Sequence, residues 1–191
     1  MAKIILASKS PRRKQLLEWA EVDFDIIVEH TDEICNETLS PEEAAIDIAM
    51  QKAEAVRQNN RERVILAADT IVVLDKELIG KPKDRKDAIE ILTRLSGRQH
   101  QVITGVVLLS EKKIVSFADI TEVEFHSLTR QQLIYYVDKY QPYDKAGAYA
   151  IQEWIGVTGI RSIRGDFYNV MGLPVSRVLQ SLREFSPESL V

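Results

Sequence analysis

Residues 64–74, VILAADTIVVL, are aliphatic apart from one charged residue and one threonine at the middle of the run. Such a long β-branched stretch is typical of a central strand that is buried on both faces. The charged residue is Asp69, and a carboxylate is costly to bury unless cations, hydrogen bonds or a metal ion surround it. Asp69 is therefore a candidate reactive group. The plainer alternative is a structural aspartate at a strand end that bonds to backbone.

A candidate cationic partner lies on the preceding helix. Ser40, Pro41 and Glu43 are typical of the cap, first turn and capping-box acid of a helix that runs to about residue 59. Lys52 falls at helical spacing on the apolar face of this helix rather than on its polar face. That face consists of Ala45, Ile48, Ala49, Ala53 and Val56. An inward lysine needs a partner, and Asp69 is one.

Three further polar residues are candidates with plainer alternatives. Lys81, in the GKP turn, is a second possible partner of Asp69 or a solvated turn lysine. Glu33 lies in an acidic loop and is either a site residue or one exposed acid among several. Gln152 follows AGAYAI and is either a site residue or a surface amide. None of these residues is a strong indication by itself.

The first helix begins with an unusual concentration of positive charge. Within ILASKSPRRKQLL, residues 4–16, Ser10 is a good N-cap and Pro11 a good first helical residue. Leu16, Leu17 and Ala20 then form the buried side. The cations around the free N–H donors are Lys9, Arg12, Arg13 and Lys14. Cations oppose the helix dipole at this end, whereas a bound phosphate would reconcile the two, so we expect an anion site. The alternative is a solvated basic face.

The remaining pattern predicts a mixed α/β sheet covered by helices. Strands are expected at residues 3–7, 24–30, 64–74, 100–109 and 113–125, with a short return strand within residues 75–82. Further helices are expected after the caps Asp84 and Thr129, and from Pro174. Residues 159–174 are interpreted as a hairpin that turns at Arg164, Gly165 and Asp166.

Composition restricts the classes of function. The chain has 191 residues, a net charge of −4 and no linker-like segment, which favours one domain, or one core with two lobes. A general nucleic-acid binder would be basic, so the basic cluster is expected to bind a small ligand. The single cysteine, Cys35, and the lack of any long apolar segment predict a cytoplasmic protein that does not enter a membrane.

Motif searches exclude several common enzyme classes. The sequence contains no phosphate-binding P-loop, no G-x-G-x-x-G, no H-E-x-x-H, no G-x-S-x-G and no Cys/His metal spacing. Its three histidines, His30, His100 and His126, are scattered and are interpreted as structural or exposed. Hard oxygen ligands with lysine and arginine remain, which is the set expected for magnesium-assisted chemistry on a polyphosphate.

Eight short blocks, in order, resemble the Maf family of nucleoside triphosphate pyrophosphatases. They are LASKSPRR, QKA, AADTIV, GKP, LSGRQHQVITGV, TEVEF, DKAGAYAIQ and NVMGLP. The resemblance implies a single Maf-like domain over residues 1–191 with two lobes and a cleft. It also implies a largely antiparallel mixed sheet, similar to inosine triphosphate pyrophosphatases, and a homodimer. The implied reaction is hydrolysis between the α and β phosphates.

The resemblance also assigns roles by position. Ser8, Arg12 and Arg13 match the loop that grips phosphate, and Lys52 and Lys81 match two inward lysines. Asp69 matches the proton acceptor, and Glu33 an acid linked to the metal and water, so both are implied to hold magnesium or manganese. Arg12, Thr70 and Gln152 match the specificity positions of dTTP/UTP pyrophosphatases.

Two alternatives to this function stay open. One is a different enzyme, which either cleaves the terminal phosphate or is a pyrophosphatase that prefers a modified or methylated purine nucleotide. The other is a nucleotide-sensing regulator of septum formation, in which hydrolysis is incidental. A buried acid beside inward lysines favours catalysis, and house-cleaning of nucleotide pools is the expected role.

Overall fold

The structure is a computed structural model that describes residues 3–32, 34, 36 and 38–185. Glu33 and Cys35 therefore lie outside the described residues. The strands are β1 (Ile4–Leu6), β2 (Phe24–Ile26), β3 (Ile65–Leu74), β4 (Glu77–Ile79), β5 (Gln99–Leu109), β6 (Ile114–Phe125) and β7 (Ile160–Arg164). The helices are α1 (Pro11–Trp19), α2 (Pro41–Arg57), α3 (Arg85–Leu95), α4 (Arg130–Tyr140), η1 (Ala146–Ala148), α5 (Trp154–Gly159), α6 (Phe167–Met171) and α7 (Val175–Leu182). Of the helices within the described residues, none is long and apolar enough to cross a membrane.

The strands form one mixed sheet in the order β2-β1-β3-β5-β6-β7, with β4 paired to β3. β1 is parallel to both β2 and β3, whereas the β3–β4 and β6–β7 pairs are antiparallel. Contacts divide the chain into two compact units. Unit 1 is Met1–Asp69, Thr104–Asp119 and Gly172–Val191, and unit 2 is Thr70–Ile103 and Ile120–Met171. The mixed α/β class expected from the sequence is confirmed.

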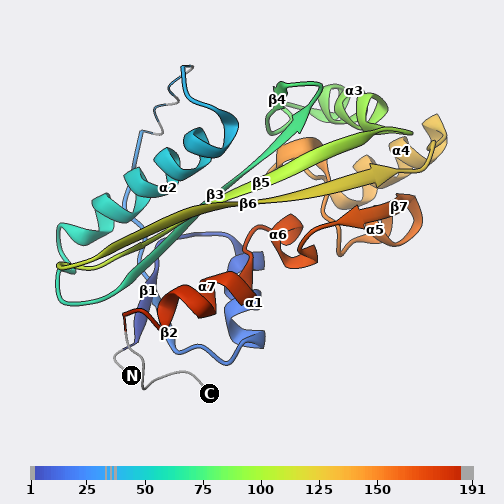
Figure 1. The fold of residues 1–191 in the computed structure, drawn as a ribbon. Helices are drawn as coiled ribbons and strands as arrows, with labels where there is room; N and C mark the ends of the chain where they lie inside the picture. The colour runs from blue at the N-terminus through green and yellow to red at the C-terminus, as the bar shows by residue number, and fades with distance from the viewer. Residues whose placement is uncertain (1–2, 33, 35, 37, 186–191) are drawn as a thin grey trace. The chain divides into compact units, whose positions relative to one another are not determined.

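Unit 1 is built around the predicted apolar strand. The first four residues of β3 are buried, as are all three residues of β1. α2 covers one face of these strands, and α7 lies on their other side (Figure 1). The core under α2 consists of Ile5, Ala7, Ala49, Ala53, Val56, Ile65, Ala67, Val107 and Leu109. The apolar face of α2 predicted from sequence therefore packs on the sheet.

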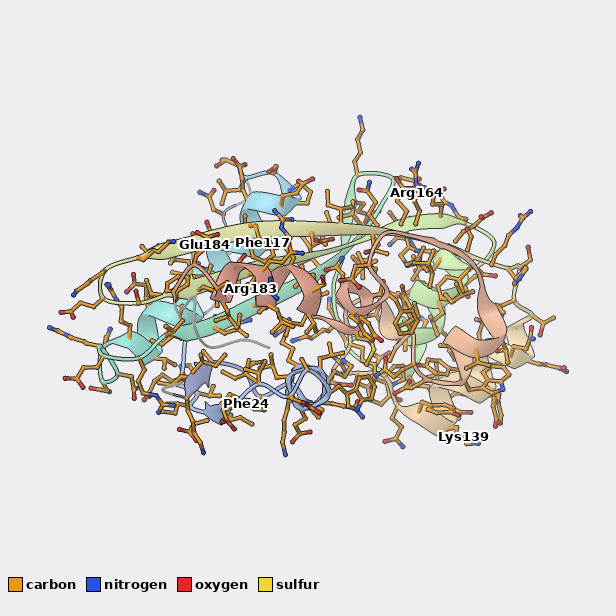
Figure 2. All side chains as sticks on the ribbon, turned by 60° about the horizontal axis from the view of Figure 1, so that its bottom comes forward. Phe24, Phe117, Lys139, Arg164, Arg183 and Glu184 are labelled. Carbon is orange, nitrogen blue, oxygen red and sulfur yellow. The ribbon has the colours of Figure 1, made fainter. Side chains whose placement is uncertain are left out.

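The C-terminal helix α7 is fixed to the β5–β6 hairpin of unit 1. The Arg177 guanidinium lies 4.1 Å from the centre of the Phe117 ring in β6. At the end of the described chain, Lys113 Nζ lies 2.7 Å from a carboxylate oxygen of Glu184. Phe117 and Glu184 are labelled beside α7 in Figure 2. These contacts hold the last helix on the sheet.

Gly105 in β5 permits the close approach of α2. A Cβ atom at this position would lie 2.3 Å from the carbonyl carbon of Ala45 and 2.4 Å from the nitrogen of Ile46. Both of these are backbone atoms, so no side-chain rotation relieves the overlap. The glycine within an otherwise apolar strand is therefore required for helix–sheet packing.

Unit 2 contains its own buried aromatic group. Nε2 of His100 lies 2.7 Å from the Tyr149 hydroxyl oxygen, and the Phe125 ring centre lies 5.1 Å from that of Tyr149. Burial lowers the pKa of His100 to about 4, so its ring is neutral at pH 7. His30 and His126 are exposed. The interpretation of the three histidines as structural or exposed is confirmed.

Local signals predicted the helix starts correctly. Ser10 caps α1, Asp84 caps α3, and both capping boxes, Ser40 with Glu43 and Thr129 with Gln132, are formed. Three details differ from the predictions. The second strand was predicted over residues 24–30 but ends at Ile26. Ala20 was predicted on the buried side of the first helix but is its half-buried C-cap. The short helices η1 and α5 were not predicted.

The predicted hairpin at Arg164, Gly165 and Asp166 is wrong. β7 ends at Arg164 and pairs with β6, and the chain then enters α6. The side chain of Asp166 accepts a hydrogen bond of 2.8 Å from the Tyr168 N–H, which starts a helical turn rather than a returning strand. The turn residues were recognised, but their capping function was not.

We expect Gly105→Ala to lower the free energy of unfolding by about 3 kcal/mol or more, because the new methyl group overlaps helix backbone. Gly80→Ala is the matched control, since nothing lies within 4 Å of a Cβ at that position. Its effect should stay within about 0.5 kcal/mol. Urea unfolding followed by circular dichroism measures both variants. Equal stability of the two would contradict the close approach of α2.

Candidate functional site

Asp69 and Lys52 form an ion pair in unit 1. Lys52 Nζ from α2 lies 2.7 Å from Oδ1 of Asp69 in β3, and the two side chains are 19% and 17% exposed. Asp69 lies in the middle of the strand and not at its end. The cationic partner predicted for Asp69 is thus present in Lys52, and the alternative of a strand-end aspartate bonded to backbone does not hold.

The geometry of the pair leaves part of the carboxylate available. Oδ1 of Asp69 accepts the hydrogen bond from Nζ of Lys52. Both side chains retain some exposure, so a ligand can reach them. An oxygen in this position suits a proton or a hard cation.

A divalent cation fits these residues only as an ion shared with the substrate. Among the residues that the structure describes, no three His, Cys, Asp or Glu side chains come together as a metal cage. Magnesium is usually bound by one or two carboxylates together with substrate phosphates and water. Asp69 suits that mode. Glu33, the second expected ligand, lies outside the described residues, but its neighbour Ile34 exchanges two backbone hydrogen bonds, of 3.1 and 3.0 Å, with the Gln51 amide of α2.

The start of α1 brings Ser8 and Arg13 together. The Ser8 hydroxyl accepts hydrogen bonds of 3.2 Å from the Ser10 N–H and of 3.2 Å from Nη1 of Arg13. Nε of Arg13 donates to the Gly172 carbonyl at 2.8 Å, just before α7. Ser8 and Arg13 are both 8% exposed. Arg13 therefore ties the β1–α1 loop to the segment that leads into α7, and at least two of its donors serve that purpose.

The four cations at this helix start do not form one cluster. Arg13 is buried, Arg12 is half-buried and Lys9 is exposed. Lys14 forms an exposed ion pair of 3.4 Å with Glu18, one turn along α1. The first turn of α1 contains no acidic residue, so no carboxylate of the helix itself offsets the positive end of its dipole.

The other predicted site residues belong to unit 2. Thr70 directly follows Asp69 in β3 and is half-buried. Lys81 is exposed in the segment after β4 and forms no ion pair with a described residue of its unit, so the alternative of a solvated lysine stays open. Gln152 is exposed in a tight turn between η1 and α5.

A polar network contacts this turn, and no pattern in the sequence predicted it. Tyr136, Glu153 and Lys145 contact one another in unit 2 through hydrogen bonds and an ion pair. Tyr136 falls on the buried side of α4 with Leu133 and Val137, where helical spacing indicates only a core position. Only the motif DKAGAYAIQ, which contains Lys145, drew attention to this region.

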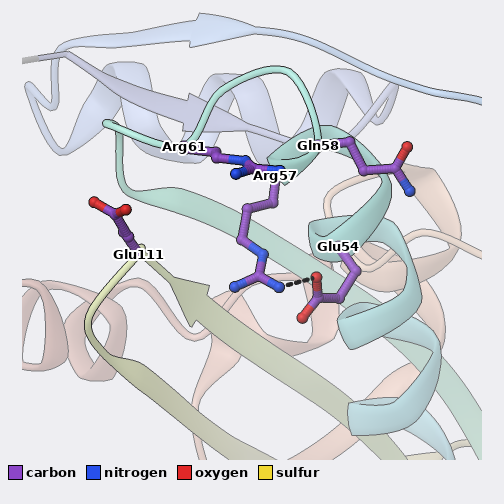
Figure 3. A pocket seen from close by; sticks show the side chains of 5 residues that line it. All are labelled: Glu54, Arg57, Gln58, Arg61 and Glu111. Carbon is purple, nitrogen blue, oxygen red and sulfur yellow. Dashed lines mark ion pairs between the residues drawn. The ribbon is translucent and has the colours of Figure 1, made fainter.

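Unit 1 also has a surface hollow that contains none of the predicted site residues. Glu54, Arg57, Gln58, Arg61 and Glu111 line it (Figure 3). Arg57 is paired with Glu54 at 2.8 Å, and both side chains are more than a third exposed. Arg57 and Glu54 thus neutralise each other at an exposed position, and we assign no reaction to this hollow.

Comparisons with known proteins show the family of this chain. A family model described as "Maf-like protein" matches residues 3–185. The dTTP/UTP pyrophosphatase of Bacillus mycoides is 45% identical over 188 residues, which is 98% of each chain. That of Bacillus cytotoxicus is 45% identical over 185 residues, 97% of this chain and 96% of the relative. The solved structure of the Staphylococcus aureus Ham1 protein covers 96% of this chain and 98% of its own, with a TM-score of 0.53 and 19% identity. The similarity to the Ham1 structure concerns the fold alone, and it supports the expected architecture.

Proposed function

Because this chain belongs to the Maf family and is a nucleoside triphosphate pyrophosphatase, we propose that it hydrolyses dTTP and UTP to the monophosphate and pyrophosphate. The observation that carries the chemistry is the Asp69–Lys52 pair. The carboxylate of Asp69 lies within an apolar strand, is 17% exposed, and is held by a lysine of α2. The substrate rests on the relatives' names at 45% identity and on Arg12, Thr70 and Gln152. The expected role of the enzyme is to remove nucleotides from the cytoplasmic pool. The enzyme is expected to act as a homodimer.

Asp69 accepts the proton of the attacking water. Lys52 holds the carboxylate through Oδ1, which leaves Oδ2 to take the proton as the water attacks the α-phosphorus. The bond from this phosphorus to the bridging oxygen breaks, and pyrophosphate leaves with the electron pair. Lys52 then faces negative charge that develops on the phosphate oxygens.

The triphosphate is bound by the start of α1 and by cations. Arg12 and the positive end of the α1 dipole bind phosphate oxygens, and Ser8 and Lys81 add a hydroxyl and a charge. Arg13 contributes by holding Ser8 in place and by its positive charge. Fixing the chain of phosphates in this way places the α-phosphorus next to the water.

A divalent cation, magnesium or manganese, is proposed to be held by Asp69, Glu33 and phosphate oxygens, where it supplies Lewis-acid polarisation of the water and phosphate. The carboxylate of Asp69 suits this role because carboxylate oxygens are the hard ligands that magnesium and manganese prefer. Removing divalent ions with a chelator should therefore abolish turnover.

Gln152 reads the base. Its amide both donates and accepts, and so complements the O4 and N3–H groups of uracil and thymine. Thr70 and Arg12 complete the set of specificity residues. Cytosine and the purines present different edges and are expected to bind less well.

Product analysis tests the proposal. The protein is incubated with magnesium or manganese and a panel of canonical and modified nucleoside triphosphates, and pyrophosphate and orthophosphate are measured separately. We expect pyrophosphate with UMP or dTMP. Orthophosphate, or preference for a modified or methylated purine, would favour another enzyme. Binding without turnover would favour a nucleotide-sensing regulator of septum formation.

Asp69→Asn should lower kcat by at least about 100-fold, because the amide cannot accept the proton. The fold should survive, since the side chain keeps its shape and Lys52 retains access to water. Asp138→Asn is the matched control, because it makes the same change in the exposed ion pair with Arg85. Steady-state kinetics and thermal unfolding measure both variants. Near-normal turnover by Asp69→Asn would refute the assignment.

Gln152→Glu should lower kcat/KM for UTP and dTTP by about 10- to 100-fold, since a carboxylate cannot donate to O4 and repels it. Gln131→Glu, an exposed position in the first turn of α4, makes the same charge change as a control. Rates for UTP, CTP and GTP are compared at equal metal concentration. An unchanged preference for pyrimidines would exclude Gln152 as the reader.

A further inference from the structure

Gln152 is held in an unusually constrained turn. The Glu153 N–H donates to the Ala150 carbonyl at 3.1 Å, which closes residues 150–153 into a turn. Ile151 is 3% exposed, whereas Gln152 beside it is exposed. α5 begins at Trp154, directly after the turn. The turn therefore has one side chain fixed in the core and the next presented outward.

One buried phenol binds both ends of this turn. The Tyr136 hydroxyl accepts a hydrogen bond of 3.1 Å from the Ala150 N–H and donates to the carboxylate of Glu153. Tyr136 is fully buried, and its ring is stacked on that of Tyr140, with 5.0 Å between the ring centres. Burial and the contact with Glu153 raise the pKa of Tyr136, so the phenol keeps its proton and stays a donor.

Charge and backbone packing hold the turn from its other sides. Nζ of Lys145, a residue 9% exposed, lies 3.6 Å from Glu153 and 2.8 Å from Asp144. A Cβ at position 156 would lie 1.7 Å from the Ile151 carbonyl oxygen, so Gly156 allows α5 to pack directly against the turn. The Glu153 carboxylate thus connects the phenol to a buried ammonium group.

This network has no catalytic chemistry of its own to explain it. The hydrogen bonds of the Tyr136 hydroxyl are made to the backbone and to a side chain of the turn. Groups that pre-organise a binding residue lower the cost of ordering it when the ligand binds. The residue that these contacts pre-organise is Gln152. It is the only exposed side chain of the turn, since Ala150, Ile151 and Glu153 are buried or half-buried.

We propose that Tyr136, with Glu153 and Lys145, is a positioning residue for base selectivity, because it fixes the turn that presents the Gln152 amide to the base. The inference rests on the proposed function, in which Gln152 reads a pyrimidine. Tyr136 contacts no substrate. Its loss affects how well the pyrimidine edge is bound and leaves phosphate cleavage intact.

Tyr136→Phe tests this inference by removing only the hydroxyl. We expect KM for UTP to rise about tenfold with little change in kcat, so that the UTP/GTP ratio of kcat/KM falls about tenfold. Tyr140→Phe makes the same change on the stacked neighbour and should leave the ratio unchanged. A folded Tyr136→Phe variant with the wild-type ratio would overturn the inference.

Two further comparisons separate positioning from stability and from failure of the proposed function. If Tyr136→Phe does not fold, Glu153→Ala and Glu153→Gln replace it. The glutamine still accepts from the phenol and should keep more of the UTP/GTP ratio than the alanine, and equal ratios would overturn the inference. In a Gln152→Ala background, Tyr136→Phe should cause no further loss. If Gln152→Ala alone leaves the ratio unchanged, the base-reading proposal fails first, and this inference with it.

Discussion

The contact between Lys52 and Asp69 is the interaction on which the arrangement of unit 1 depends. A carboxylate in the middle of an apolar strand costs several kcal/mol to bury alone, and Lys52 would be equally costly on the apolar face of α2 without a counter-charge. Each residue therefore offsets part of the cost of burying the other. The pair therefore requires α2 to cross the sheet at close range, and Gly105 provides the space for that approach.

Two buried side chains, Arg13 in unit 1 and Tyr136 in unit 2, hold other residues in place. Arg13 is buried and ties Ser8 to the carbonyl of Gly172, so the β1–α1 loop and the segment before α7 are held together. In unit 2, Tyr136 ties both ends of the turn that carries Gln152. In each unit a buried side chain thus fixes the backbone next to a residue that is proposed to bind substrate, which favours precise recognition over adaptability.

Much of this was predictable because the relevant signals are local. Ser40 and Glu43 lie three residues apart, so a capping box needs no tertiary partner. The Lys52–Asp69 pair followed from two patterns, each of which left one charge unexplained. The Tyr136–Glu153 contact joins α4 to a distant turn, and nothing in the spacing of α4 distinguishes its phenol from a core residue. The hairpin predicted at Gly165 was wrong for the same reason, because it depended on a contact distant in sequence: β7 pairs with β6 and not with the residues that follow it.

The central claim is that water activated at Asp69 attacks the α-phosphorus, and hydrolysis of UTP in ¹⁸O-labelled water tests it most directly. The label is located in the products by mass spectrometry after a single turnover. The account predicts that the label enters UMP and is absent from pyrophosphate. Label in pyrophosphate would mean attack on the β-phosphorus and would contradict the account.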